Sequence, residues 1–240
     1  MSFSVLRDAA WAPELETRDA WLDWAYNSRT IAGQRTPPTA PMPPLLRRRA
    51  GFLGRMALEV AYQCLGTQLD IPVVLASRHG DTPRVVDLLF ELAREAPLSP
   101  TSFGLSVHNA IGGLFSIARA DHANMIAIAG GKSTVEYAAL EACSLLEEGA
   151  PLVLMVAYDC ALPPIYKTFV DDGDQPYAWA WLMKSPGGAD CLNLHCSSSE
   201  TNSPETAGSP GLDVWRFYLR DDRHLERTSN GRRWLWTRGA

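Results

Sequence analysis

The sequence has few cysteines and histidines, and none of them is spaced as a metal-ligand pair. Its five cysteines contain no CxxC pair, and its five histidines are scattered along the chain. Structural zinc sites need such ligands in closely spaced pairs. We therefore expect no metal site and no cofactor. The odd number of widely spaced cysteines also favours a reducing compartment over a disulfide-stabilised fold.

Excess basic charge, long apolar runs and a secretory leader are lacking as well. Lysine and arginine total 22 against 27 acidic residues, a formal charge of −5, so the general attraction to phosphate that drives non-specific nucleic-acid binding is missing. Apolar runs such as residues 152–157 are far shorter than the roughly 20 residues of a membrane span. The opening MSFSVLRDAAWAPELE has no cationic segment followed by an apolar one. These absences predict no nucleic-acid partner, no membrane span and a cytoplasmic location.

The sequence does contain an alternation of strand and helix patterns. Phe52, Met56, Val60 and Cys64 recur every four residues and predict a helix that ends at Gly66. Beyond it, short apolar runs alternate with amphipathic stretches, which indicates an α/β fold with parallel strands and right-handed crossovers. The expected strands are 71–77, 125–130 and 152–157, and the expected helices are 82–96, 106–118 and 133–148.

The last third of the chain is less regular. Two strands are expected at Tyr177–Lys184 and 190–196, and the stretch SSSETNSPETAGSPG has the composition of a linker. A short aromatic segment and the ending RRWLWTR follow it. We expect a main domain over 1–196, a flexible linker over 197–211, and a C-terminal helix and strand over 212–240.

Residues 131–134, Gly-Lys-Ser-Thr, lie between an expected strand and an expected helix. A phosphate-binding loop would need a glycine where Ile126 stands, so a nucleotide-binding regulator is the weakest hypothesis. The simplest interpretation is a capping box, with Ser133 as the N-cap and Glu136 three residues later. Acyl-transfer enzymes often hold a nucleophile at such a turn. Our second hypothesis is a free-standing acyl-transfer enzyme with Ser133 as that nucleophile, although the sequence assigns no general base to it.

The helix expected over 106–118 carries an uncommon pair of glycines. Gly112 and Gly113 follow His108 and precede the bulky Leu114 and Phe115. Each glycine costs a helix about 1 kcal/mol relative to alanine, so close approach of another element or a ligand would explain them. Two interpretations stay open, a tightly packed core helix and a helix that lines a tunnel.

Four segments resemble a known family. WAPEL, PLLRRRAGFLGRMALEVA, ASRHGDTPRVVDLL and LSPTSFGLSVHNAIGGLFSI are similar to the short beta-ketoacyl-synthase-like proteins, which match the N-terminal half of a ketosynthase and are chain-length-factor-like. The tail, with DVWRFYL and RRWLWTR, also resembles the ending of those proteins. The most specific segments surround His79 and His108.

The resemblance implies half of a thiolase-like fold, a five-stranded mixed sheet flanked by helices. It implies that one strand pairs with a second subunit across an interface, and that Lys132 stands at or next to the position of the catalytic cysteine of active ketosynthases. The catalytic histidines of those enzymes lie in a second half that this chain does not contain. The residues of the implied interface strand are Met125, Ile126, Ala127, Ile128 and Ala129.

The leading hypothesis is therefore a subunit that is not an enzyme on its own. It would pair with a full-length ketosynthase, meet the acyl carrier protein through that complex, and shape the acyl tunnel, as in aryl polyene or related polyketide pathways. His108, Leu114 and Phe115 are the expected tunnel or gate residues, and Phe115 is favoured over Leu114 as the plug because its ring is flat and bulky. The arginines at positions 47–49 either stay solvated or pair with carboxylates of a neighbouring subunit.

Overall fold

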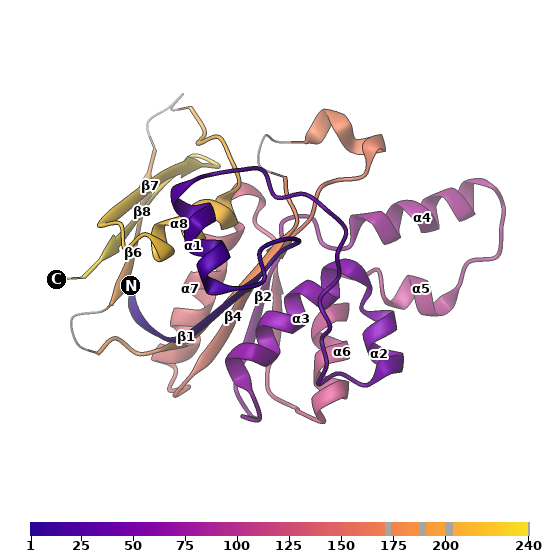
Figure 1. The fold of residues 1–240 in the computed structure, drawn as a ribbon, viewed down its shortest axis with the longest axis horizontal. Coiled ribbons are helices and arrows are strands. Elements are labelled where there is room, and N and C mark those ends of the chain that lie inside the picture. Colours follow the sequence, from indigo (N-terminus) through magenta and orange to yellow (C-terminus); the bar gives the residue numbers. More distant parts are fainter. Residues whose placement is uncertain (171–173, 188–190, 200–203, 240) are drawn as a thin grey trace.

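The alternating pattern of the sequence forms one mixed sheet with helices on both faces (Figure 1). The computed structural model describes residues 1–170, 174–187, 191–199 and 204–239. The strands are β1 (Ser2–Trp11), β2 (Val73–Ala76), β3 (Met125–Ile128), β4 (Val153–Asp159), β5 (Tyr177–Lys184), β6 (Leu192–Ser198), β7 (His224–Ser229) and β8 (Arg232–Arg238). The helices are α1 (Arg18–Tyr26), α2 (Pro44–Arg49), α3 (Gly51–Leu65), α4 (Thr82–Ala93), α5 (Pro100–Gly104), α6 (Ala110–Arg119), α7 (Thr134–Glu147) and α8 (Pro210–Leu219), with 3₁₀ turns η1 (Gly131–Ser133) and η2 (Pro164–Phe169).

The sheet has eight strands in the order β3-β2-β4-β5-β1-β6-β8-β7. Strand β2 lies between β3 and β4 and is parallel to both, and the other neighbouring pairs are antiparallel. The α/β class is confirmed, but the expectation of five strands is wrong. The additional strands are β1, which lies between β5 and β6, and the C-terminal hairpin β7-β8, which joins the sheet through β6.

Side chains of alternate strand residues enter two separate cores, as the period of a strand requires. Val73 and Leu75 pack on the face that α3 and α6 cover, whereas Val74 and Ala76 pack on the face that α1, α7 and α8 cover. The second core is rich in tryptophan, including Trp179, which stacks on Trp215 of α8 with ring centroids 5.6 Å apart. The two cores pack β2 and β4 between α3 on one face and α7 on the other, and so fix the positions at which these strands end.

Several elements differ from the sequence-based expectation. The helix expected over 82–96 ends at Ala93. The one expected over 106–118 begins only at Ala110 as α6, and the separate short helix α5 precedes it. Strand β1 was not predicted, because Arg7 and Asp8 interrupt its apolar pattern. No helix within the described ranges is long and apolar enough to cross a membrane.

The predicted division into three parts falls partly outside the described residues, which exclude 171–173, 188–190, 200–203 and 240. Ser198 ends β6 and Pro210 begins α8, so both margins of the expected linker belong to regular elements. Inside it, the Thr206 amide donates to the Thr228 carbonyl at 2.8 Å. The flexibility of this segment stays a prediction.

Candidate functional site

The turn between β3 and α7 places Lys132 at the end of the sheet. Gly131, the first residue of η1, adopts φ +59°, a conformation that glycine allows without strain. The Lys132 ammonium lies 3.1 Å from a carboxylate oxygen of Glu205. A cation at the positive end of a helix is unfavourable, and the nearby carboxylate offsets that cost.

Ser133 occupies the predicted N-cap position of α7, but its side chain does not cap the helix. Its side chain makes no capping bond and is fully buried. The Ser133 hydroxyl lies 2.6 Å from the hydroxyl of Ser229 and accepts a hydrogen bond from the Trp234 indole at 3.0 Å. The capping-box prediction is therefore wrong, because the Ser133 hydroxyl binds Ser229 and Trp234 of the C-terminal hairpin instead of a backbone amide of α7. Neither partner is a general base, so this environment does not activate Ser133 as a nucleophile.

The hairpin β7-β8 holds the same turn through further contacts. The Asn230 side-chain amide donates to the Gly130 carbonyl at 3.1 Å. The ring of Tyr137 meets that of Trp234 edge-on, with centroids 5.4 Å apart. A Cβ atom on Gly130 would collide with the Tyr137 ring. Because these partners lie about a hundred residues apart in the chain, no local sequence pattern could have revealed them.

A buried ionic cluster connects α7 to the C-terminal elements. Arg227 on β7 is fully buried, and its Nε atom lies 3.4 Å from a carboxylate oxygen of Glu136, which is also fully buried. Arg227 also pairs with Asp213 of α8. Burial raises the pKa of both Glu136 and Asp213, although the Arg227 charge opposes the rise. Glu136, predicted as half of a capping box, thus pairs with a residue of β7 instead.

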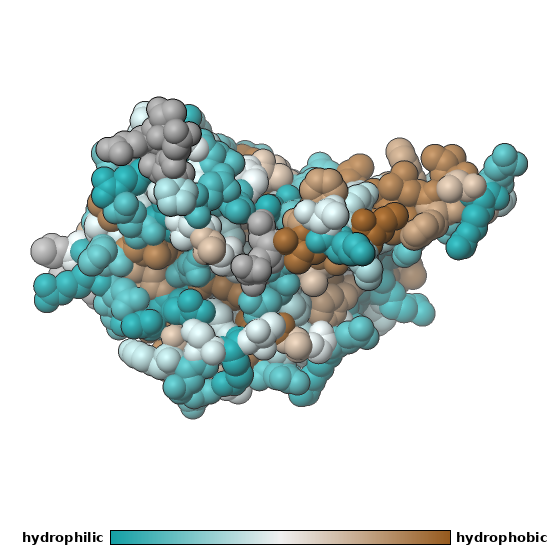
Figure 2. Space-filling view, turned by 90° about the horizontal axis from the view of Figure 1, so that it is seen from above, coloured by the Kyte–Doolittle hydropathy of each residue, from teal (hydrophilic) through white to brown (hydrophobic). Residues whose placement is uncertain are grey.

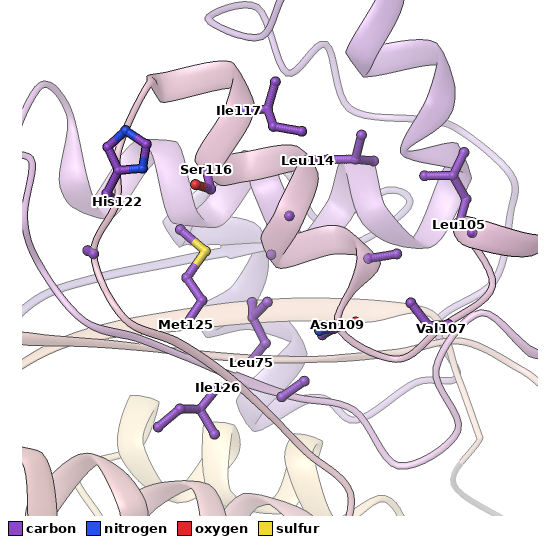
Figure 3. A pocket seen from close by; sticks show the side chains of 16 residues that line it. Leu75, Leu105, Val107, Asn109, Leu114, Ser116, Ile117, His122, Met125 and Ile126 are labelled. Carbon is purple, nitrogen blue, oxygen red and sulfur yellow. The ribbon is translucent and has the colours of Figure 1, made fainter. Parts of the chain in front are cut away.

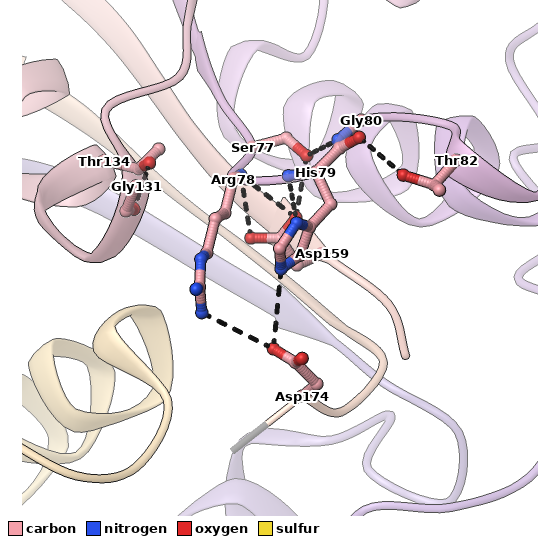
Figure 4. A network of polar contacts seen from close by, with 9 residues as sticks. All are labelled: Ser77, Arg78, His79, Gly80, Thr82, Gly131, Thr134, Asp159 and Asp174. Atoms are coloured by element: carbon pink, nitrogen blue, oxygen red, sulfur yellow. Dashed lines mark hydrogen bonds and ion pairs between the residues drawn. The ribbon is translucent and has the colours of Figure 1, made fainter. Parts of the chain in front are cut away.

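A polar network lies where β2 and β4 end (Figure 4). The Asp159 carboxylate accepts hydrogen bonds from the Ser77 hydroxyl at 2.8 Å and from the backbone amides of Arg78 and His79. Asp174 lies 3.9 Å from the Arg78 guanidinium and 3.7 Å from the His79 ring. Desolvation raises the pKa of Asp159 despite these donors. The network fixes the geometry of one loop, because both carboxylates bind residues directly after β2.

His108, an expected gate residue, is held by the same loop. Its Nε2 atom lies 2.9 Å from the Ser77 carbonyl oxygen. A Cβ on Gly80, which has φ +61°, would come within 3.1 Å of the His108 ring. The side chain therefore connects the loop after β2 to the start of α6.

A cavity of about 500 Å³ lies between α6 and β3 (Figure 3). Leu114 and Ile117 line it from α6, and Met125, Ile126 and Ala127 line it from β3. The wall of the cavity therefore contains both Leu114, which the sequence suggested for a tunnel, and residues of β3, which it suggested for an interface.

Phe115 lies elsewhere. Its side chain is 1% exposed, does not line the cavity, and packs against Tyr62 of α3 with ring centroids 5.0 Å apart. Consecutive helix positions point about 100° apart, so only Leu114 of the two faces the cavity. Leu114, rather than the favoured Phe115, thus lines this cavity, and a tunnel role for either residue stays a prediction.

The two glycines of α6 differ in how closely other side chains approach them. A Cβ on Gly112 would lie 3.0 Å from the Leu75 side chain and 3.5 Å from the Met125 sulfur, whereas one on Gly113 would meet nothing within 4 Å. Gly112 therefore permits the close approach of α6 to the sheet that the sequence suggested. Gly113 lines the cavity.

Strand β3 is the edge of the sheet. It pairs with β2 from Val73–Met125 to Ala76–Ile128, and its four residues are all partly exposed. No charged side chain lies on it. Ala129, the last of the predicted interface residues, follows the strand directly. An edge that is uncharged, and that no other described strand pairs, is suited to pairing with another chain.

The arginines at 47–49 lie on α2. Arg47 donates to the Pro38 carbonyl at 3.1 Å, and the Arg49 carbonyl accepts from Arg84 at 3.2 Å. Arg48 and Arg49 are exposed. Their pairing with a second subunit stays a prediction. Within the described ranges no cluster of three or more His, Cys, Asp or Glu side chains could hold a metal ion.

Comparison with known proteins decides the family. Residues 21–237 match the model described as the beta-ketoacyl synthase N-terminal domain. The chain belongs to the beta-ketoacyl synthase family. This confirms the resemblance seen in the sequence. No curated protein gives a significant match.

Solved structures agree with this family. A chain from the complex of the ketosynthase ApeO with its chain length factor ApeC, from Xenorhabdus doucetiae, shares 25% identity at a TM-score of 0.83, covering 99% of this chain and 100% of that one. The ishigamide ketosynthase/chain length factor matches at 15% identity and a TM-score of 0.65, over 84% and 69% of the two chains. A ketosynthase of the bacillaene synthase from Bacillus subtilis 168 matches at 13% identity and a TM-score of 0.60, with 92% of this chain covering 45% of that one. The ketosynthase-like protein thus has a thiolase-like fold that closely matches structures of ketosynthase and chain length factor complexes.

Proposed function

We propose that this chain is a non-catalytic, chain-length-factor-like subunit that pairs with a full-length ketosynthase and shapes its acyl tunnel. The observation that carries the proposal is the β3-α7 turn. Lys132 occupies it and faces Glu205, while Ser133 is buried against Ser229. The pocket beside Gly131 and Thr134 has a volume of only about 20 Å³, room for about one water molecule.

The thiols near the cores do not replace the missing nucleophile. Burial raises the pKa of Cys64 to about 12, of Cys143 to about 11 and of Cys160 to about 12. Thiols with such values stay protonated at neutral pH, and only the thiolate attacks an acyl thioester. This supports a role other than catalysis for the chain by itself.

The partner is proposed from the relatives and from β3. The similar chain from Xenorhabdus doucetiae comes from a complex of a ketosynthase with its chain length factor. Here the uncharged edge of β3 offers backbone groups that a strand of a second subunit would pair. The cavity beside β3 would then be closed by the ketosynthase, and Leu114 would form part of the tunnel wall. The acyl carrier protein would meet this chain through the complex, and a polyene-type product stays a prediction.

Co-expression with the neighbouring full-length ketosynthase tests the pairing. The wild-type pair should co-purify, and Ile128→Glu should abolish binding because it places a charge on the β3 edge. Leu6→Glu is the matched control, since Leu6 is 47% exposed on β1, four strands away. Melting curves of the free chains check folding. Unchanged binding of a folded Ile128→Glu variant would place the interface elsewhere.

Labelling with an activated acyl thioester tests the absence of catalysis. The free chain should acquire no acyl group by mass spectrometry, whereas its ketosynthase partner should be labelled. An acyl group on Ser133 would establish the second hypothesis, a free-standing acyl-transfer enzyme.

A further inference from the structure

The segment from α4 to α5 projects from the body of the molecule (Figure 1). We call residues 82–107 the arm. Every residue from 92 to 101 is exposed. Seen from above, hydrophobic side chains gather along this projection, and hydrophilic ones cover its tip (Figure 2). The arm is therefore an apolar extension that the rest of the chain leaves uncovered.

Helix α4 is well formed but has no core of its own. The Asp81 side chain caps its first turn and Pro83 stands in that turn, where its missing N–H costs nothing. Val86 is the single buried residue among its twelve. The exposed apolar residues of the arm, 39–63% exposed each over α4, α5 and their connection, are Leu89, Phe90, Leu92, Leu98 and Phe103. Contiguous exposed apolar surface of this kind marks an interaction site.

Both arginines of the arm have partners close by. Arg84 forms an ion pair with Asp81, with 2.8 Å between Nε and Oδ2. The Arg94 guanidinium lies over the Phe90 ring, 5.8 Å from its centroid. The arm also carries the carboxylates of Asp87, Glu91 and Glu95, so a partner meets acidic side chains beside the apolar ones.

The arm is continuous with the β3 edge. Gly104, Leu105 and Val107, at its end, line the same cavity as Met125 and its neighbours on β3. Val107 is 49% exposed, and Ile117, on the α6 wall of that cavity, is 67% exposed. A subunit that pairs with β3 therefore meets the rim of the cavity and then the arm.

From this continuity we infer that the arm docks on an apolar surface of the ketosynthase partner and so extends the β3 interface. The inference rests on the proposed function for the identity of the partner. A single subunit covers the strand edge, the mouth of the cavity and the arm. Much of the binding free energy then comes from the large apolar residues of the arm, as is usual for the buried centre of an interface.

The test uses two matched double variants of the full chain, each with the co-purifying ketosynthase. Leu92→Ser with Phe103→Ser removes two arm residues that are 58% and 63% exposed. Leu6→Ser with Tyr26→Ser removes a leucine and an aromatic residue that are 47% and 65% exposed on β1 and α1. The arm variant should bind the ketosynthase at least about 30-fold more weakly. The control should bind within about twofold of wild type, and both should melt with the wild-type chain because neither change touches the core.

The outcomes separate the two proposals. Equal affinity of the arm variant and wild type overturns the docking of the arm while leaving the ketosynthase partnership intact. An equal loss in both variants also overturns it, because the effect would then be general to exposed apolar groups. If the arm variant instead turns a dimer of this chain into a monomer in sedimentation without weakening ketosynthase binding, the arm joins two copies of this chain and the inference is wrong. Failure of the wild-type chain to bind any ketosynthase overturns the proposed function itself.

Discussion

Replacing Arg227 with methionine should destabilise the protein more than any surface change. The side chain is fully buried between Glu136, itself fully buried, and Asp213. Without the guanidinium, two carboxylates remain close together inside the protein with no cation. Breaking a buried pair in this way costs about 3–5 kcal/mol. For a chain of this size, that corresponds to a melting temperature lower by roughly 6–20 °C.

The control for this variant is Arg233→Met. Arg233 pairs with Glu226 on the surface, where the two side chains are 51% and 45% exposed. Exposed pairs contribute about 0–1 kcal/mol. Urea denaturation followed by circular dichroism, together with thermal melting, gives both free energies of unfolding. A second variant, Glu136→Gln, should cost less than Arg227→Met, because Arg227 keeps Asp213 as its partner.

The loss should also depend on pH. Burial raises the pKa of Glu136 above its ordinary value of 4.5, and removal of Arg227 raises it further. A carboxyl group whose pKa is higher in the folded protein stabilises the fold below its ordinary pKa and loses that contribution as pH rises through the folded value. The deficit of Arg227→Met should therefore be largest near neutral pH and shrink toward about pH 5. A deficit below about 1 kcal/mol, or one that does not change with pH, would refute this account of the cluster.

The other predictions concern the turn and the cavity. Lys132→Ala should leave turnover of the ketosynthase complex within about threefold, since its partly exposed ion pair contributes at most about 1 kcal/mol; complete loss of turnover would make Lys132 a catalytic residue. Phe115→Ala should lower the free energy of unfolding by about 3–5 kcal/mol with product length unchanged, whereas Leu114→Ala should change product length by a few carbons in mass spectrometry. The reverse pattern would restore Phe115 as the tunnel residue. Gly112→Ala should destabilise by about 1–3 kcal/mol, because its Cβ presses on the sheet, while Gly113→Ala should stabilise α6 by up to about 1 kcal/mol. Equal effects in urea denaturation would contradict the packing described for Gly112.

The sequence by itself determined the fold class, the family and most of the regular elements. The bounds of β5 agree at both ends with the pattern Tyr177–Lys184, and α3 ends at Gly66 as predicted. These features depend on local periodicity and on residues with strong backbone preferences, both of which a single chain displays. The need for close packing at Gly112 was visible for the same reason, because a glycine inside a helix has a local cost.

Only the tertiary structure decided the roles of individual side chains around the turn and the cavity. Ser133 and Glu136 have the spacing of a capping box. In the structure, however, Ser133 hydrogen-bonds to Ser229 and Glu136 forms an ion pair with Arg227. Capping is worth about 1 kcal/mol, whereas an unpaired buried Arg227 would cost several times more, so the distant contact prevails. Likewise, which of two adjacent residues on α6 faces the cavity depends on how the helix is rotated against α3 and the sheet. That rotation is set by packing between distant segments, which the local pattern of one helix does not contain.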